Sequence, residues 1–215
     1  MTGVQHFEAA MNRHERNLIG RLTSPPDIQA FLDGIAYKAK TSYQSPLGVL
    51  RTREANCFDG ALFAAAALRR MGQAPLILHM RAADDDDHII ALYRRNGCVG
   101  AVAKSNFVGL RYRDPIYRNV RELLLSYFEL YFNRKGKKSL RGYTGPLNLS
   151  AFDRISWMTR DDSIEAISQR LDSLKQHPLI PAPLVRLLSP VDRRTYRANL
   201  LGATMRAVHR RKRGQ

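Results

Sequence analysis

The chain has 215 residues, of which 44% are hydrophobic and 25% are charged, a composition typical of a globular protein. Its longest apolar runs are too short to span a bilayer, and residues 1–16 contain neither the apolar stretch nor the cleavage site of a secretory signal. Two cysteines, Cys57 and Cys98, do not make a disulfide framework in a chain of this size. We therefore expect a cytoplasmic protein without a membrane span.

The formal net charge is +16, from 35 Lys and Arg residues against 19 Asp and Glu residues. A surface of this sign attracts phosphate polymers, anionic lipids and acidic proteins alike. Part of the excess lies in two basic stretches, residues 133–142 and the tail at 209–213. Neither a zinc-finger spacing nor an aromatic RNA-binding motif accompanies them, so the charge favours a solvated surface over a reader of nucleic-acid sequence.

The first elements expected along the chain are helices. Residues 5–22 have a weak helical pattern, and a Pro-containing break at 24–27 precedes a helix over about 28–40. The apolar residues of this second helix recur at spacings of three and four, which predicts one buried face. A loop is expected around residues 44–48.

The stretch NCFDGALFAAAALRRMG, residues 56–72, predicts the central helix of the domain. Asn56 is a preferred N-cap residue, and Asp59 places a carboxylate in the first turn, where exposed N–H groups favour negative charge. Gly72 stands where a helix commonly ends. Residues 61–68 are all apolar or small, so the helix should be buried on every side.

An antiparallel meander should pack on this helix. Residues 74–80 predict a buried strand, and residues 88–95 and 98–105 predict a hairpin whose turn is Asn96-Gly97. The expected fold class is therefore α+β, with a buried cysteine-bearing helix packed on an antiparallel sheet.

The remainder of the chain is expected to be mostly helical, with helices over 119–133, 161–175 and about 190–208. We place a core at residues 1–118 and a helical extension with a basic tail at 119–215. This extension either stands apart or packs on the same domain.

Cys57 occupies the first turn of the central helix, where unpaired N–H groups and the helix dipole stabilise a thiolate. The same end of the helix can donate hydrogen bonds to an oxyanion, so Asn56 and Phe58 are expected to line the site. His88 is the natural base, because strand geometry allows its ring to project toward the helix.

The hairpin predicts where a group that orients the imidazole should lie. If Asn96-Gly97 is a two-residue turn, His88 lies opposite Ser105, whereas a slip of one residue would place Asn106 there. Residues 84–87 are four consecutive Asp residues before His88, but four neighbouring acids cannot all face one ion, so we expect no metal and no cofactor.

The order of a cysteine-led buried helix, a strand, a histidine-led strand and a return strand resembles the transglutaminase-like superfamily, which has a papain-like fold. The resemblance lies in NCFDGALFAAAALRRMGQAPLIL and DDDHIIALYRRNGCVGAVAKS, and covers about residues 27–110. It implies that Cys57 is the nucleophile and His88 the base.

The third catalytic residue of that family is usually an Asp on the strand after the histidine, where this chain has Lys104, Ser105 and Asn106. An Asn can orient a neutral imidazole, as in papain-like enzymes, but it does not balance an imidazolium as a carboxylate does. Asp114 would serve if the loop after the hairpin folds back, and Asp87 should point to the other face of its strand.

The leading hypothesis is a cysteine hydrolase or acyltransferase that acts on a protein, peptide or other amide or ester through a Cys57 thioester. Two alternatives are a catalytically inactive binding module of the same fold and a binder of nucleic acid or another anionic partner through the basic surface and tail. The substrate, the acyl acceptor and the oligomeric state are left open by the sequence.

Overall fold

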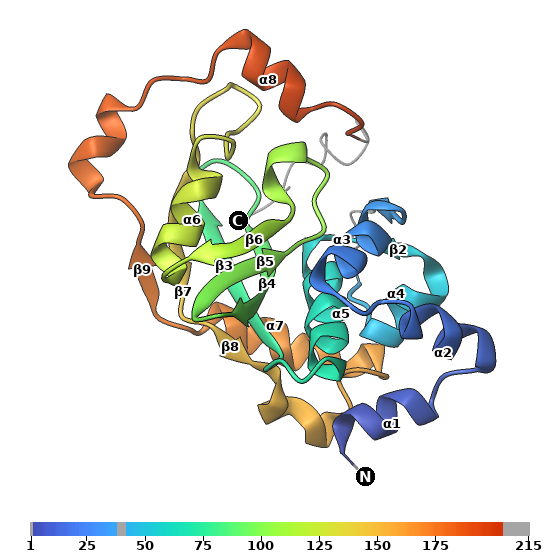
Figure 1. Cartoon of the computed structure of the whole chain (residues 1–215). Coiled ribbons are helices and arrows are strands. Elements are labelled where there is room, and N and C mark those ends of the chain that lie inside the picture. The colour runs from blue at the N-terminus through green and yellow to red at the C-terminus, as the bar shows by residue number, and fades with distance from the viewer. Residues whose placement is uncertain (1, 38–41, 204–215) are drawn as a thin grey trace.

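The computed structural model describes residues 2–37 and 42–203. A seven-stranded sheet runs through the molecule in the order β6-β5-β4-β3-β7-β9, with β8 also paired to β3, and its named pairings are all antiparallel. Helices cover both faces of this sheet (Figure 1). The predicted α+β class is confirmed.

The N-terminal helices are shorter than the sequence predicted. Residues 5–22 divide into α1 and α2, because Asn12 accepts a hydrogen bond from the Glu15 N–H and starts a new helix. The third helix ends at Asp33, and the chain then enters the short strand β1. These elements are α1 (Gly3–Ala9), α2 (Arg13–Gly20), α3 (Pro25–Asp33), β1 (Ala36–Tyr37), α4 (Pro46–Thr52) and β2 (Glu54–Ala55).

The central helix α5 spans Cys57–Arg70, and its predicted N-cap is present: the side chain of Asn56 accepts a hydrogen bond from the Asp59 N–H at 2.9 Å. Every residue from Phe58 to Leu68 is buried. The helix lies between the sheet and the helices α1, α3 and α4. Its small residues allow this close packing, as the prediction of a helix buried on all sides required.

The strands β3 (Leu76–Ala82), β4 (His88–Arg95) and β5 (Cys98–Val102) form the predicted meander. Arg95 pairs with Cys98, so the turn has two residues and the predicted register is confirmed. Alternate residues of the strands divide between the two faces. Ile77, Ala91 and Val102 pack with α5, whereas Leu78, Ile90 and Ala101 pack with α6 (Val120–Phe128).

The region after residue 119 contains strands that the sequence did not predict. β7 (Leu140–Thr144) and β8 (Leu147–Asn148) pair with β3, and β9 (Gln176–Pro178) pairs with β7. Each is only two to five residues long, and their pairing partners are remote in sequence. The other elements are β6 (Arg113–Tyr117), α7 (Ile164–Asp172), α8 (Arg193–Asn199) and the 3-10 helices η1 (Val108–Leu110), η2 (Leu149–Ile155), η3 (Asp161–Ser163) and η4 (Ala182–Leu187). Within the described ranges, no helix is both long and apolar enough to cross a membrane.

Candidate cysteine site

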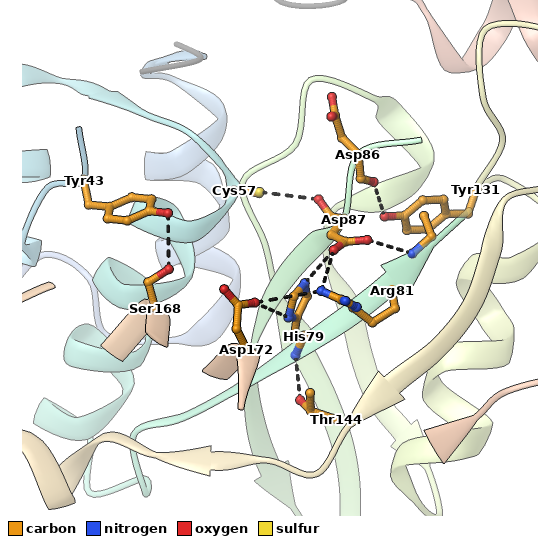
Figure 2. A network of polar contacts seen from close by, with 11 residues as sticks. Tyr43, Cys57, His79, Arg81, Asp86, Asp87, Tyr131, Thr144, Ser168 and Asp172 are labelled. Carbon is orange, nitrogen blue, oxygen red and sulfur yellow. Dashed lines mark hydrogen bonds and ion pairs between the residues drawn. The ribbon is translucent and has the colours of Figure 1, made fainter. Parts of the chain in front are cut away.

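Cys57 is the first residue of α5, and its sulfur lies 3.9 Å from the backbone oxygen of Asp87, the residue before β4 (Figure 2). Burial raises the pKa of the Cys57 thiol to about 11, and the carboxylates of Asp59 and Asp86 act in the same direction. The backbone N–H groups of Ile89 and Phe58 face the sulfur and act to lower that pKa. At neutral pH the group is therefore a protonated thiol with two N–H donors already beside it.

Tyr37 is a member of the site that the sequence analysis missed. It lines the pocket together with Cys57, and burial, with a smaller effect of the Cys57 group, raises the pKa of this tyrosine well above its usual value. This placement depends on the parallel pairing of β1 with β2, which brings Tyr37 beside Ala55, two residues before the cysteine. No local sequence pattern indicates such a two-residue pairing.

His88 lies on the face of the sheet that carries α6. It pairs with Met80 of β3, and its ring makes an edge contact with Tyr131, with ring centroids 6.5 Å apart. From the sequence we expected this ring to project toward α5. Instead, the two-residue period of β4 places positions 88, 90 and 92 together on the opposite face.

The ring nitrogen Nε2 of His88 lies 2.9 Å from the backbone oxygen of Leu110. Burial lowers the pKa of His88 to about 4, against the smaller opposing effect of this hydrogen bond. The imidazole is therefore neutral at pH 7. Because a carbonyl oxygen only accepts, Nε2 carries the proton and Nδ1 is left as the basic nitrogen.

Cys57 and His88 both line one pocket, together with Ser105 and Asn106. In the described part of the chain, however, no hydrogen bond joins the Cys57 sulfur to the His88 ring: the sulfur contacts the strand backbone, and the ring bonds to Leu110. The space in this pocket that water can reach is about 70 Å³, which holds only a few water molecules.

The register of the hairpin sets Ser105 opposite His88, although the paired ladder ends at Ala91 and Val102. The Ser105 hydroxyl accepts a hydrogen bond from the Phe107 N–H at 3.0 Å, and both Ser105 and Asn106 are buried. Leu110 thus provides the observed hydrogen-bond partner of the imidazole, and it does so through its backbone.

The two other residues expected at the site have their side chains elsewhere. Asn56 uses its side chain to cap α5, and the Phe58 ring packs in the core, edge-on to Tyr43 with centroids 5.0 Å apart. Phe58 reaches the site through its backbone N–H, which faces the sulfur. Asp114 lies in the edge strand β6, where it is exposed, and does not line the pocket.

The acidic loop 83–87 forms one wall of the pocket and is held from several directions. The Asp87 carboxylate accepts hydrogen bonds from the Ala82 N–H at 2.8 Å and from Arg81 at 3.1 Å, and lies 3.1 Å from His79 Nε2 (Figure 2). The Tyr131 hydroxyl donates to the backbone oxygen of Asp86 at 2.7 Å. The Asp87 side chain points away from His88, as the alternation of the strand requires, but it contacts His79 on the face that carries α5, so the face expected for Asp87 was wrong together with that of His88. The loop presents its backbone to the sulfur.

Three other features singled out in the sequence are Cys98, the acidic run as a metal site, and the basic stretches. Both cysteines are free, and Cys98 lies at the start of β5. Among the described residues, no group of three His, Cys, Asp or Glu side chains is arranged to hold a metal ion. The basic stretch at 133–142 forms the turn before β7 and enters that strand, while the basic tail at 209–213 lies outside the described residues.

Two solved structures of LapG from Legionella pneumophila, one of them EGTA-treated, are similar to this chain at 14% sequence identity and a TM-score of 0.35. The alignments cover 48% of this chain and 73% of the LapG chain in one case, and 49% and 70% in the other. No family model and no curated protein matches the chain.

Proposed function

We propose that this chain is a transglutaminase-like cysteine hydrolase or acyltransferase, in which Cys57 forms a thioester with the acyl group of a protein, peptide or other amide or ester. One observation carries the proposal: the Cys57 sulfur stands at a helix N-terminus with backbone N–H groups facing it, in a pocket that His88 also lines. A thiol in this setting has donors ready to stabilise negative charge.

In the proposed reaction, Nδ1 of His88 takes the proton of the Cys57 thiol, and the sulfur attacks the carbonyl carbon of the substrate. The N–H groups at the start of α5 donate to the oxyanion that forms. Collapse of this tetrahedral species breaks the bond to the leaving amine or alcohol, which receives the proton from the imidazolium. Water or a second nucleophile then attacks the thioester and releases the free thiol.

The resting site is not primed for this transfer. A thiol pKa of about 11 and an imidazole pKa of about 4 correspond to a cost of roughly 10 kcal/mol for moving the proton between them. The proposed reaction therefore requires that the His88 ring turn toward the sulfur and that water or substrate dipoles enter the pocket. Low reactivity of the unliganded protein is the expected consequence.

A thioester trap tests the proposal. The full chain is incubated with activated esters and with a peptide library, quenched in acid, and analysed by mass spectrometry of the intact protein and its peptides. We expect an acyl adduct on Cys57 in the native chain and in Cys98→Ser, none in Cys57→Ala, and an adduct that forms much more slowly in His88→Ala. An adduct that forms equally well in Cys57→Ala would reject the proposal.

The alternative function is that of a catalytically inactive binding module. What favours it is that, in the described residues, the sulfur and the imidazole have separate partners and no hydrogen bond joins them. A properly folded chain that forms no acyl adduct with any substrate class would support this alternative.

A further inference from the structure

The C-terminal segment closes one side of the Cys57 pocket. Tyr196, Asn199 and Leu200 all line it, although they come from α8 and the turn after it, about 140 residues beyond the cysteine in sequence. Figure 1 shows this segment running around the sheet before it returns to the loops beside β5 and β6. The pocket is therefore bounded in part by the chain's own last described residues.

Asn199 anchors this segment through two side-chain hydrogen bonds. Only 4% of it is exposed, and its side-chain oxygen accepts a hydrogen bond from the Gly109 N–H at 2.6 Å. Its side-chain nitrogen donates to the backbone oxygen of Leu130 at 3.0 Å. One amide thus joins two separate segments, next to Leu110 and next to Tyr131, and both of these residues line the pocket.

The absence of a side chain at Gly109 leaves room for the Asn199 amide. A Cβ atom at Gly109 would lie 2.9 Å from the Asn199 side-chain oxygen and 2.5 Å from the Leu130 Cβ, so only glycine allows the approach. Two further contacts hold α8 to the turn after α6: the Tyr196 ring stacks on Phe132 with centroids 5.5 Å apart, and its hydroxyl donates to the Arg134 oxygen.

The other contacts of the segment are few: the Val191 N–H donates to the Gly136 oxygen at 2.9 Å, and the half-buried Leu188 packs at the margin of the core. Most of residues 181–190 are exposed, including Leu184 at 47% and Leu187 at 76%. Beyond Leu179, within the residues that the structure describes, no hydrophobic side chain belongs to the buried core. Burial of apolar surface is the main source of stability, and this segment is held by a few hydrogen bonds, one aromatic stack and little buried apolar surface. It should therefore open at a much smaller free-energy cost than the unfolding of the whole domain.

We propose that residues 189–203 form a strap that closes the Cys57 pocket, that Asn199 is its latch, and that release of this latch admits the substrate. The regulatory role of the strap rests on the proposed acyl-transfer function of Cys57. Closure of the pocket limits the access of reagents to the Cys57 thiol, and this access can be measured without any catalysis.

The test uses the full chain in a Cys98→Ser background, so that Cys57 is the single thiol. The rate of alkylation by iodoacetamide is measured for this parent, for Asn199→Ala and for Gly109→Ala. Loss of the two side-chain hydrogen bonds should raise the rate about tenfold or more. Arg194→Ala, an exposed change on the same helix, is the matched control and should leave the rate unchanged.

Hydrogen exchange separates release of the strap from unfolding. In Asn199→Ala, exchange should speed up at the Gly109 amide and along α8, while the amides of α5 stay protected. Equal alkylation rates in the parent and in both latch variants would overturn the strap, as would faster alkylation accompanied by loss of protection in α5.

The two proposals fail in different ways. If Asn199→Ala is alkylated faster but still forms no acyl adduct, the strap stands and the acyl-transfer function fails. If acyl adducts form at the same rate in the parent and the latch variants, the function stands and the strap fails.

Discussion

In the resting site the ring of His88 is oriented by the backbone oxygen of Leu110, which accepts a hydrogen bond from Nε2 at 2.9 Å. In a cysteine site a carboxylate or an amide side chain commonly has this role. A backbone carbonyl selects the same tautomer, with a basic Nδ1, but brings no negative charge to stabilise an imidazolium. His88 is buried, and none of the described residues pairs a negative charge with its ring, so the ring resists protonation.

Stability should depend on the protonation of His88. Its pKa is about 4 in the folded chain, against about 6.5 when unfolded, so between these values the unfolded state binds a proton that the folded state does not. Protonation of this group therefore lowers the free energy of unfolding by roughly 3 kcal/mol as the pH falls from 6.5 to 4, and has no effect on it above pH 6.5. Urea unfolding across this range should have a smaller pH dependence in His88→Gln than in the native chain.

The control for this titration is His14→Gln, which changes an exposed histidine of α2. Its pH dependence should follow that of the native chain. An NMR titration of the His88 ring that gave a midpoint near 6.5 would contradict the prediction directly.

The thiol of Cys57 should ionise only at high pH. Because burial raises its pKa to about 11, the rate of alkylation should keep rising with pH beyond 10. The measurement is a pH–rate profile in Cys98→Ser, compared with the profile of Cys98 in Cys57→Ala. A Cys57 profile that levels off near pH 8 would show that the N–H donors of Phe58 and Ile89 outweigh burial.

Gly60 of α5 lies against Lys104, which follows strand β5. A Cβ atom there would lie 2.3 Å from the Cβ of Lys104, whose ammonium donates to the backbone oxygens of Leu32 and Ile35. Gly60→Ala should therefore destabilise the chain by about 1–3 kcal/mol through overpacking, in spite of the higher helix propensity of alanine.

Gly20→Ala provides the matched comparison for this helix substitution. Gly20 is also helical, and beyond its chain neighbours and the backbone of its own helix no atom lies within 4 Å of the position its Cβ would take, so the change should be neutral or stabilise by up to about 1 kcal/mol. Thermal unfolding of the two variants measures the difference, and equal transition temperatures would refute the steric argument.

Asp87 should stabilise the loop beside Cys57 through its carboxylate. Burial works to raise the pKa of this group, but the hydrogen bonds from His79 and the Ala82 N–H and the charge of Arg81 bring it below its usual value. Its contribution is thus present at neutral pH and lost as the pH falls below about 4. Asp87→Asn should cost about 1–3 kcal/mol in urea unfolding at pH 7.

Asp84→Asn is the corresponding control in the same loop. Asp84 is exposed and has a φ of 54°, a conformation that Asn also tolerates, so the substitution should change stability by less than about 0.5 kcal/mol. Similar losses of unfolding free energy in both variants would mean that the negative charge of the loop, and not the contacts of Asp87, accounts for the destabilisation.

The sequence predicted α5 and the hairpin well because their signals are local. Asn56 marks the start of the helix, and Asn96-Gly97 determines that Arg95 pairs with Cys98. The face of His88 was not predictable in this way. Residues 88–93 are buried almost throughout, so both faces of β4 carry apolar side chains and the alternation does not tell which face meets α5.

The remaining parts of the site depend on contacts between distant segments. Asn199 meets Gly109 across 90 residues, and nothing in the sequence around either residue indicates the other. Tyr37 reaches Cys57 through a two-residue parallel pairing. Such contacts follow from how the whole chain packs and not from periodicity or capping.

The pairing of β3 with β7 also has a consequence for synthesis. β3 lies in the interior of the finished sheet, but its partners β7 and β8 leave the ribosome some sixty residues after it. Until residues 140–148 emerge, one edge of β3 presents unpaired N–H and C=O groups on a largely buried, apolar strand. A nascent or truncated chain that stops before β7 should therefore associate with other chains through this edge, and early engagement by a chaperone would protect it.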